Sequence, residues 1–292
     1  MTNQPPPIGE VRRSFVTARG VRFHVTEAGP ADGRPVLALH GWPQHHWVYR
    51  DLLADPPPGM RIIAPDLPGY GWSGPAPHRW AKEDVVSDLV ALLDELGVDR
   101  FLLVGHDWGG FIGYLLTMRI PERIDGYLVL NIAHPWVPPK VFARHAWRFA
   151  QYQPHIAIAG VPLQRRSRFL ERLYKHAAPG LGPEVVRTYT ERFRDPVVAR
   201  TARDTYRTFL FRELPAAARK GERRRVTVPV RALFGKDDKA IHPDLAAAET
   251  ARADDYTLEV VDGGHFILDE NPDGVRAKLI ALAAEFPAIA AE

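Results

Sequence analysis

The chain has no cysteine among its 292 residues, which excludes a disulfide framework, a thiolate metal site and a thiol nucleophile. No apolar run reaches the roughly 18 residues that a membrane-spanning helix needs. The N-terminus also lacks the basic segment and apolar stretch of a secretory signal peptide. The formal net charge is only +3, without a basic tail. We therefore expect a cytoplasmic protein that does not span a membrane and does not bind nucleic acid.

Three signatures of other enzyme classes are missing as well. The histidines have no carboxylate or cysteine partners at the spacing of metal ligands, and no glycine-rich phosphate-binding loop is present. We therefore expect neither a metal nor a cofactor. The pattern Gly-x-Ser-x-Gly does not occur either, which argues against a serine esterase or lipase.

Short apolar segments alternate with segments of helical period along most of the chain. Hydrophobic residues make up 46% of the sequence, enough for a large core. The first two segments predict a hairpin that turns at Arg19-Gly20, and the clearest helix is 82–97. Further strands are expected at 35–40, 60–65, 100–106, 126–131, 228–235 and 256–263. The alternation predicts an α/β fold, with a mostly parallel twisted sheet covered by helices on both faces.

A block of helical segments interrupts the strand series between about residues 135 and 213. Its segments 142–152, 163–177, 184–193 and 197–211 all have a helical period. Pro183 and Pro196 stand where proline is favoured, in the first turn of a helix. The sequence therefore predicts a core of residues 1–134 and 214–292, with a helical cap inserted at 135–213.

The segment GHDWGG, residues 105–110, directly follows the expected strand 100–106. It has the small-x-nucleophile-x-small form of a sharp strand-to-helix turn, the nucleophile elbow. Gly105 and Gly109 allow strand and helix to approach closely, and Asp107 is presented where backbone N–H groups favour an anion. A second interpretation is that Asp107 only caps the helix that follows.

Three further segments stand at strand ends. His40-Gly41-Trp42-Pro43 follows the strand 35–40, so a backbone N–H of this loop is expected to join the N–H of Trp108 in a two-donor oxyanion hole. Asp238 lies in GKDD just after strand 228–235, and His265 follows the last strand. Nucleophile, acid and histidine thus occur in the chain order of a catalytic triad.

The order HGWP, DLPGYG, GHDWGG, GKDD, GGH resembles the α/β-hydrolase superfamily over essentially the whole chain. More narrowly it resembles the epoxide hydrolase family, in which the nucleophile is an aspartate. The resemblance implies that Asp107 is the nucleophile, His265 the base and Asp238 its orienting acid. It also implies that Trp42 and Trp108 donate their backbone N–H groups to the oxyanion.

Members of that family use two cap tyrosines to protonate the epoxide oxygen. Tyr152, in FAQYQ, and Tyr206, in DTYRTF, match those positions. Phenols suit this task because they are neutral at pH 7 and can donate a hydrogen bond as charge develops. Packing of the cap against the core is the alternative role for both. Tyr174 and Tyr189 are the competing cap tyrosines, and packing explains them better.

A carboxylate nucleophile attacks alkyl carbons that carry a strained ring or a good leaving group, so its ester is hydrolysed at the enzyme's own carbonyl. The resemblance therefore implies hydrolysis of a small hydrophobic epoxide to a vicinal diol, with water and without a cofactor. The sequence leaves open whether the protein is a monomer or a homodimer. A haloalkane dehalogenase with the same triad is the first alternative, in which the Trp108 indole would hold the halide. However, Trp42 replaces the Asn or Glu common in that family, and Asn131 occupies the place where some of its members carry their acid. A non-catalytic ligand-binding protein is the second alternative.

Overall fold

The computed structural model describes residues 4–247 and 252–286. Within them an eight-stranded sheet has the order β1-β2-β4-β3-β5-β6-β7-β8. β1 and β2 are antiparallel to their neighbours, and the strands from β4 to β8 are parallel. The strands are β1 (Arg12–Ala18), β2 (Val21–Ala28), β3 (Arg34–Leu39), β4 (Met60–Pro65), β5 (Phe101–His106), β6 (Ile124–Leu130), β7 (Val230–Gly235) and β8 (Tyr256–Val261). The six strands expected after the hairpin all form, with ends within two residues of those expected.

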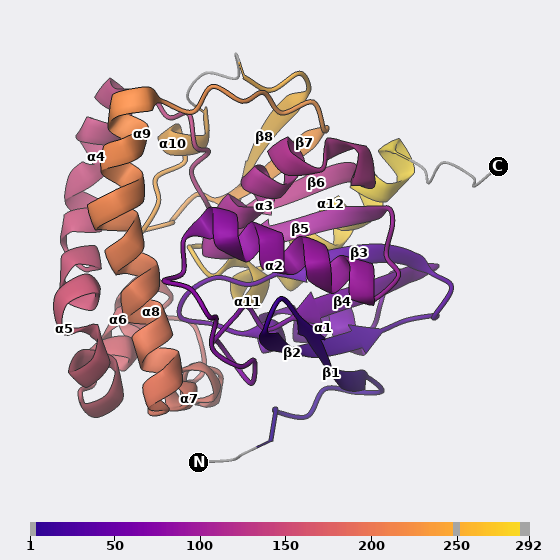
Figure 1. Ribbon diagram of the computed structural model, residues 1–292, viewed down its shortest axis with the longest axis horizontal. Coiled ribbons are helices and arrows are strands. Elements are labelled where there is room, and N and C mark those ends of the chain that lie inside the picture. The colour runs from indigo at the N-terminus through magenta and orange to yellow at the C-terminus, as the bar shows by residue number, and fades with distance from the viewer. Residues whose placement is uncertain (1–3, 248–251, 287–292) are drawn as a thin grey trace.

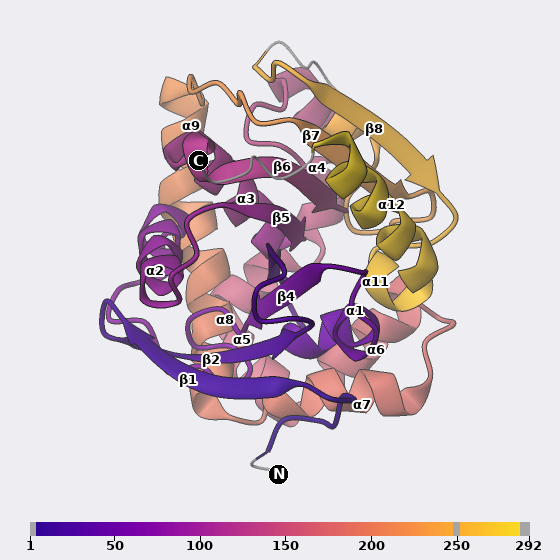
Figure 2. The ribbon, with the colours of Figure 1, turned by 90° about the vertical axis from the view of Figure 1, so that its right-hand side faces the viewer.

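The hairpin turns where the sequence indicates. Arg19 and Gly20 both have positive φ, 47° and 80°, as the two central residues of a type I′ turn require. β1 and β2 pair in register on either side of this turn, from Arg12 opposite Glu27 to Ala18 opposite Val21. The pair forms one edge of the sheet (Figure 2).

Helices cover both faces of the sheet, as expected for this class (Figures 1 and 2). α2 (Lys82–Glu95) and α3 (Trp108–Arg119) share one hydrophobic cluster with the sheet, and α1 (Arg50–Ala54) and α12 (Pro272–Glu285) share the other. The shorter helical turns are η1 (His46–Tyr49), η2 (Pro121–Arg123), α10 (Asp244–Ala247) and α11 (Ile267–Glu270). None of the helices in the described ranges is long and apolar enough to cross a membrane.

The chain between β6 and β7 is helical, and we call it the cap. Its elements are α4 (Pro139–Ala150), α5 (Gln153–Arg166), α6 (Phe169–Ala177), α7 (Pro183–Arg192), α8 (Pro196–Thr208), the π-helical turn η3 (Phe209–Glu213) and α9 (Leu214–Lys220). In Figure 1 they stand together at one end of the sheet. The division into core and cap domains at 135 and 213 stays a prediction, and the helical run continues beyond it to Lys220.

Local signals identified most cap helices but missed α9 and most of α5. α7 and α8 begin at Pro183 and Pro196, as expected. The helix expected at 163–177 is wrong, because the chain is extended at Ser167 and the segment divides between α5 and α6. α5 begins ten residues earlier than 163, at Gln153, although Pro162 lies inside it. α5 is held by its packing against α8, which tertiary structure alone provides.

Parallel pairing brings the candidate catalytic loops to one edge of the sheet. Leu39 at the end of β3 pairs with Gly105 in β5, and His106 pairs with Leu130 at the end of β6. β7 and β8 end together, with Gly235 opposite Val261. Because these strands are parallel, the loops that follow them emerge on the same side, under the cap.

Candidate active site

Asp107 lies in the turn between β5 and α3. Its backbone has φ 49° and ψ −123°, a region that side-chain-bearing residues rarely occupy. A Cβ at Gly109 would overlap the carbonyl oxygens of Leu39 and His40, so only glycine fits there. The Asp107 carboxylate makes no capping hydrogen bond to α3, and the interpretation of Asp107 as a simple helix cap is therefore wrong.

One of the two expected oxyanion donors forms a hydrogen bond with the Asp107 carboxylate. The Trp42 N–H donates to Asp107 Oδ2 at 2.8 Å. A Cβ on Gly41 would overlap the same carboxylate, which explains the glycine before Trp42. Burial raises the pKa of Asp107 to about 6, although the His265 charge and the Trp108 and Trp42 N–H groups act in the opposite direction. The peptide bond between Trp42 and Pro43 is cis.

His265 lies between the two candidate carboxylates. Its Nδ1–H donates to Asp238 Oδ2 at 2.9 Å, and its Nε2 is 3.9 Å from Asp107 Oδ1. Burial alone would lower the pKa of His265, but the charges of Asp238 and Asp107 outweigh it and raise the value to about 9. The structure thus brings together the three residues that the sequence predicts as a triad, although Asp107 lies more than 100 residues before the other two.

Asn131 is a polar residue of this site whose part the sequence analysis missed. Its Nδ2 donates to Asp238 Oδ2 at 2.7 Å and to the Gly264 carbonyl at 3.1 Å. Asn131 cannot serve as an acid, but it holds the acid that does lie beside His265. Asp238 Oδ1 accepts the Ala240 and Ile241 N–H groups, and these hydrogen bonds together with His265 lower the Asp238 pKa against the effect of burial. In the sequence, the available signal for this role was a polar residue directly after the apolar strand that became β6. In the structure, Asn131 is buried.

A cavity of about 500 Å³ lies between cap and core above Asp107. Tyr152 and Tyr206 both line it, with their ring centroids 6.0 Å apart. The Tyr206 ring packs edge-on against Trp42 at 5.3 Å and against Trp108 at 5.4 Å. Burial raises the pKa of both phenols, so both remain neutral at pH 7.

The two competing cap tyrosines are engaged elsewhere. The Tyr189 hydroxyl donates to Asp269 at 2.9 Å. Tyr174 stacks on Tyr189 at 5.9 Å and on Phe266 at 4.5 Å. Neither residue is part of the cavity lining, in agreement with a packing role.

Two contacts from distant segments hold the site tryptophans, and the sequence analysis did not find either. The Trp42 indole N–H donates to Gln164 Oε1 on α5 at 2.9 Å. The Lys82 ammonium lies 4.6 Å from the Trp108 ring centre and donates to the Thr205 carbonyl on α8 at 2.8 Å. Burial lowers the pKa of Lys82 to about 8. The first contact joins Trp42 directly to the cap, and the second joins Trp108 to the cap through Lys82.

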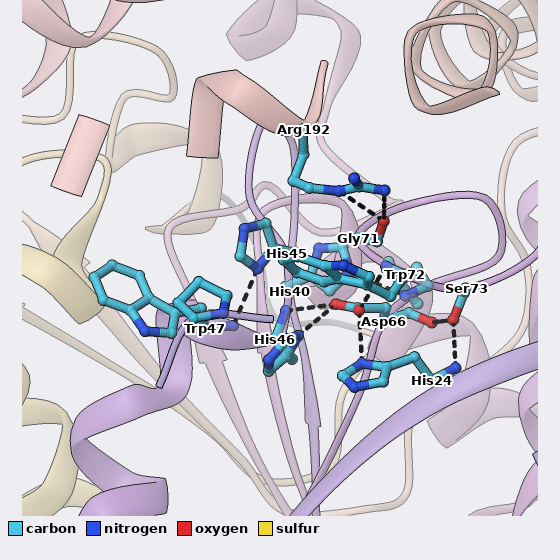
Figure 3. Close-up of polar contacts among 12 residues, drawn as sticks. His24, His40, His45, His46, Trp47, Asp66, Gly71, Trp72, Ser73 and Arg192 are labelled. Atoms are coloured by element: carbon cyan, nitrogen blue, oxygen red, sulfur yellow. Dashed lines mark hydrogen bonds and ion pairs between the residues drawn. The ribbon is translucent and has the colours of Figure 1, made fainter. Parts of the chain in front are cut away.

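A buried carboxylate, Asp66, organises the loops behind the oxyanion hole (Figure 3). Its Oδ1 accepts the backbone N–H and Nδ1 of His46, at 2.8 and 2.9 Å. Its Oδ2 accepts His24 Nδ1 and the Trp72 N–H, both at 2.9 Å. Asp66 thereby joins β2, the loop after β4 and the loop that carries Trp42. His46 therefore serves this network, and neither His45 nor His46 is part of the cavity lining.

We expect Asp66→Asn to lower the free energy of unfolding by about 2–4 kcal/mol at pH 7, because an amide cannot accept all four hydrogen bonds. Burial would raise the pKa of Asp66, but its imidazole partners hold it well below the usual value. Because the pKa of Asp66 is lower in the folded state than in the unfolded state, the ionised carboxylate stabilises the fold at pH values above the unfolded-state pKa of about 3.9. This stabilisation is lost as the pH falls from there toward the folded-state pKa. The difference in free energy of unfolding between wild type and variant should therefore become smaller below pH 4. Urea unfolding followed by circular dichroism measures this difference.

Asp32→Asn is the matched control, since Asp32 is an exposed carboxylate of the β2–β3 loop. The control should unfold like the wild type at both pH values. An Asp66→Asn variant that matches it at pH 7 would show that the four hydrogen bonds contribute nothing net.

The fold is that of a known class. Residues 34–272 match the family described as the alpha/beta hydrolase fold, and the chain belongs to that family. It is 27% identical to epoxide hydrolase 4 of Mus musculus over 91% of this chain and 77% of that protein. It is also 27% identical to haloalkane dehalogenase 2 of Mycobacterium bovis, over 92% of this chain and 93% of that protein. The crystal structure of an epoxide hydrolase from Vigna radiata has a TM-score of 0.78 and 24% identity, over 95% and 98% of the two chains.

Proposed function

We propose that this protein hydrolyses an epoxide to a vicinal diol through a covalent ester on Asp107. The observation that carries the proposal is the 2.8 Å hydrogen bond from the Trp42 N–H to Asp107 Oδ2. It means that the oxyanion donors are aimed at the enzyme's own carboxyl group, as hydrolysis of an aspartyl ester requires. The relatives named epoxide hydrolase support the same reaction.

In the first step Asp107 attacks a ring carbon of the epoxide. Oδ2 is held by Trp42, so Oδ1 is the free oxygen and forms the new C–O bond. The ring C–O bond breaks, and Tyr152 or Tyr206 transfers its proton to the departing oxygen. The product is a hydroxyalkyl ester whose carbonyl oxygen, the former Oδ2, already lies in the oxyanion hole.

In the second step His265 removes a proton from water, and the hydroxide attacks the Asp107 carbonyl carbon. The Trp42 and Trp108 N–H groups stabilise the oxyanion of the tetrahedral intermediate. The ester C–O bond then breaks, the leaving alkoxide oxygen of the diol takes the proton that the attacking hydroxide brought, and Asp107 returns as a carboxylate. The histidinium proton returns through solvent to the tyrosinate formed in the first step. Asp238 stabilises the histidinium and fixes the tautomer.

The order of the two steps explains how His265 can act as a base although its pKa is raised before the reaction. Before the reaction the charges of Asp107 and Asp238 raise the pKa of His265 to about 9. Formation of the ester removes the Asp107 charge, so the pKa of His265 falls once the intermediate exists. The histidine thus becomes a competent base at the stage where a base is needed.

Dehalogenation of a haloalkane is the second candidate, and the similarity to haloalkane dehalogenase 2 favours it. It would use the same nucleophile, base and acid but release a halide, which requires no proton. Tyr152 and Tyr206 would then have no proton to transfer.

The experiment that tests the proposal traps the intermediate. His265→Gln is incubated with styrene oxide, and separately with a 1-haloalkane, and its intact mass is measured. We expect a mass gain equal to the whole epoxide, because the first step proceeds and the second cannot. An alkyl adduct without halogen, formed only from the haloalkane, would establish the dehalogenase instead.

Two variants control this measurement. His176→Gln removes another histidine of the same cavity and should accumulate no adduct, since its ester still turns over. Asp107→Ala in the His265→Gln background should take up no mass at all. An adduct that persists without Asp107 would refute the covalent aspartyl mechanism.

A further inference from the structure

His145, His242 and Asp244 converge at the border of cap and core. His145 lies on α4 of the cap, whereas His242 and Asp244 lie in the core at the start of α10. His145 Nε2 is 3.3 Å from Asp244 Oδ2, and His242 Nδ1 is 3.4 Å from Asp244 Oδ1. One ligand-type atom of each residue lies within 4.8 Å of the others. No local sequence pattern predicts this group, because almost 100 residues separate His145 from the other two.

The burial of the three side chains suits a site that is both formed and reachable. His145 is 9% exposed, while His242 and Asp244 are 35% and 49% exposed. The two imidazoles stack in parallel, with centroids 4.4 Å apart, so each fixes the orientation of the other. The pair presents one ring nitrogen from each histidine to a single carboxylate. An ion can therefore enter from solvent and meet donors that already lie close together.

Metals bind imidazole through a ring nitrogen that carries no proton. Arg148, one turn beyond His145, is engaged with the carbonyl oxygens of Asp238 and Lys239 at 3.1 and 3.0 Å. The Asp244 N–H donates to His242 Nδ1 at 3.2 Å, a bond that a metal would replace.

We propose that His145, His242 and Asp244 form a binding site for a divalent transition metal such as Zn²⁺. Two imidazoles and one carboxylate are a ligand set that Zn²⁺ accepts, with water in the remaining positions, whereas Ca²⁺ and Mg²⁺ prefer oxygen alone. The ligand atoms now lie within 4.8 Å of one another, and zinc–ligand distances of about 2.0–2.2 Å require them to come closer together. Small rotations of the two side chains that face solvent would close this gap.

The site would join α4 of the cap directly to the core. Trp147 and Arg148 of the same helix line the cavity above Asp107. A bound metal would therefore restrain one wall of the cavity and slow any step that needs the cap to open. This effect on turnover rests on the proposed function, whereas metal binding does not.

Binding is tested on the full-length protein after treatment with EDTA, by calorimetric titration with ZnCl2. We expect one site with a dissociation constant in the micromolar range, and a melting temperature that rises with the Zn²⁺ concentration. Co²⁺ should bind at the same site with visible absorption bands, while Mg²⁺ should not bind. A titration without heat and without a change in melting temperature would overturn the proposal.

Variants separate this site from other histidines. His242→Ala and Asp244→Asn should each weaken Zn²⁺ binding at least about tenfold, and neither residue is fully buried. His155→Ala, an exposed histidine of α5, is the matched control and should bind like the wild type. Undiminished binding in His242→Ala would overturn the proposal. Turnover of styrene oxide, measured with and without Zn²⁺, is a separate readout, so loss of the proposed function would leave the binding result intact.

Discussion

Replacing Asp107 by glycine should abolish epoxide turnover, by about 10⁴-fold or more, and at the same time make the protein more stable. The loss of activity follows because the nucleophile forms the bond on which both steps depend, and the other groups cannot substitute for it. Glycine is the informative substitution because the backbone at this residue has φ 49° and ψ −123°. A glycine adopts that conformation with little strain.

The gain in stability has a second source, which depends on pH. Burial raises the pKa of Asp107 to about 6, so the folded state holds an ionised carboxylate at pH 7 at a cost of about 1–3 kcal/mol. Because the folded pKa lies above the unfolded one, this cost is present at pH 7. It disappears as the pH falls below about 4, where the carboxyl group is protonated in both states. The stabilisation by Asp107→Gly should therefore be largest at pH 7 and shrink in acid.

Melting temperatures at pH 7 and pH 4, measured beside styrene oxide turnover, test both statements. Arg19→Gly is the matched control, since Arg19 has nearly the same φ, 47°, in the exposed hairpin turn. It should leave turnover unchanged. An Asp107→Gly protein that keeps measurable turnover would exclude Asp107 as the nucleophile.

Removing both cavity phenols should slow formation of the ester by about 10³–10⁴-fold, the upper part of the roughly 10²–10⁴-fold range that general acid catalysis supplies. The change is Tyr152→Phe/Tyr206→Phe, which leaves both rings and removes only the hydroxyl groups. Either single change should cost less, about 10–100-fold, since the remaining phenol still donates a proton. The measurement is single-turnover alkylation by styrene oxide in the His265→Gln background, followed by intact mass.

Tyr174→Phe is the control, because Tyr174 is a buried cap tyrosine that stacks on Phe266 outside the cavity. Its alkylation rate should match that of the parent. Alkylation by a haloalkane should hardly respond to loss of the two phenols, since a halide leaves without a proton. An unchanged rate with styrene oxide in the double variant would remove the tyrosines from the mechanism.

The turn that carries Asp107, the proposed nucleophile, is the part of the site that sequence alone determined. The turn at Asp107 needs glycine at Gly105 and Gly109, where another backbone approaches too closely for a side chain. A requirement of this kind is met by immediate neighbours in the chain, so it leaves a local pattern. The loops of Trp42, Asp238 and His265 were found for a related reason, because each follows a strand and parallel strands end at one edge of a sheet.

The cap shows where such local signals end. Pro183 and Pro196 begin helices because the ring of proline suits the first helical turn, which is a property of the residue itself. α5 was largely missed, since contacts with α8 stabilise it despite Pro162 in its interior. Residues adjacent to α5 in the chain therefore do not predict that this helix forms.

Side-chain partnerships were decided by the tertiary structure alone. The hydrogen bond from Asn131 to Asp238, the contact of Gln164 with Trp42, and the meeting of His145 with Asp244 join residues 99 to 122 positions apart. Whether such side chains touch depends on how helices and loops pack around the sheet, which no sequence spacing encodes. The sequence thus determined which backbone turns can present a nucleophile, a base and an acid, and packing decided which neighbours hold them in place.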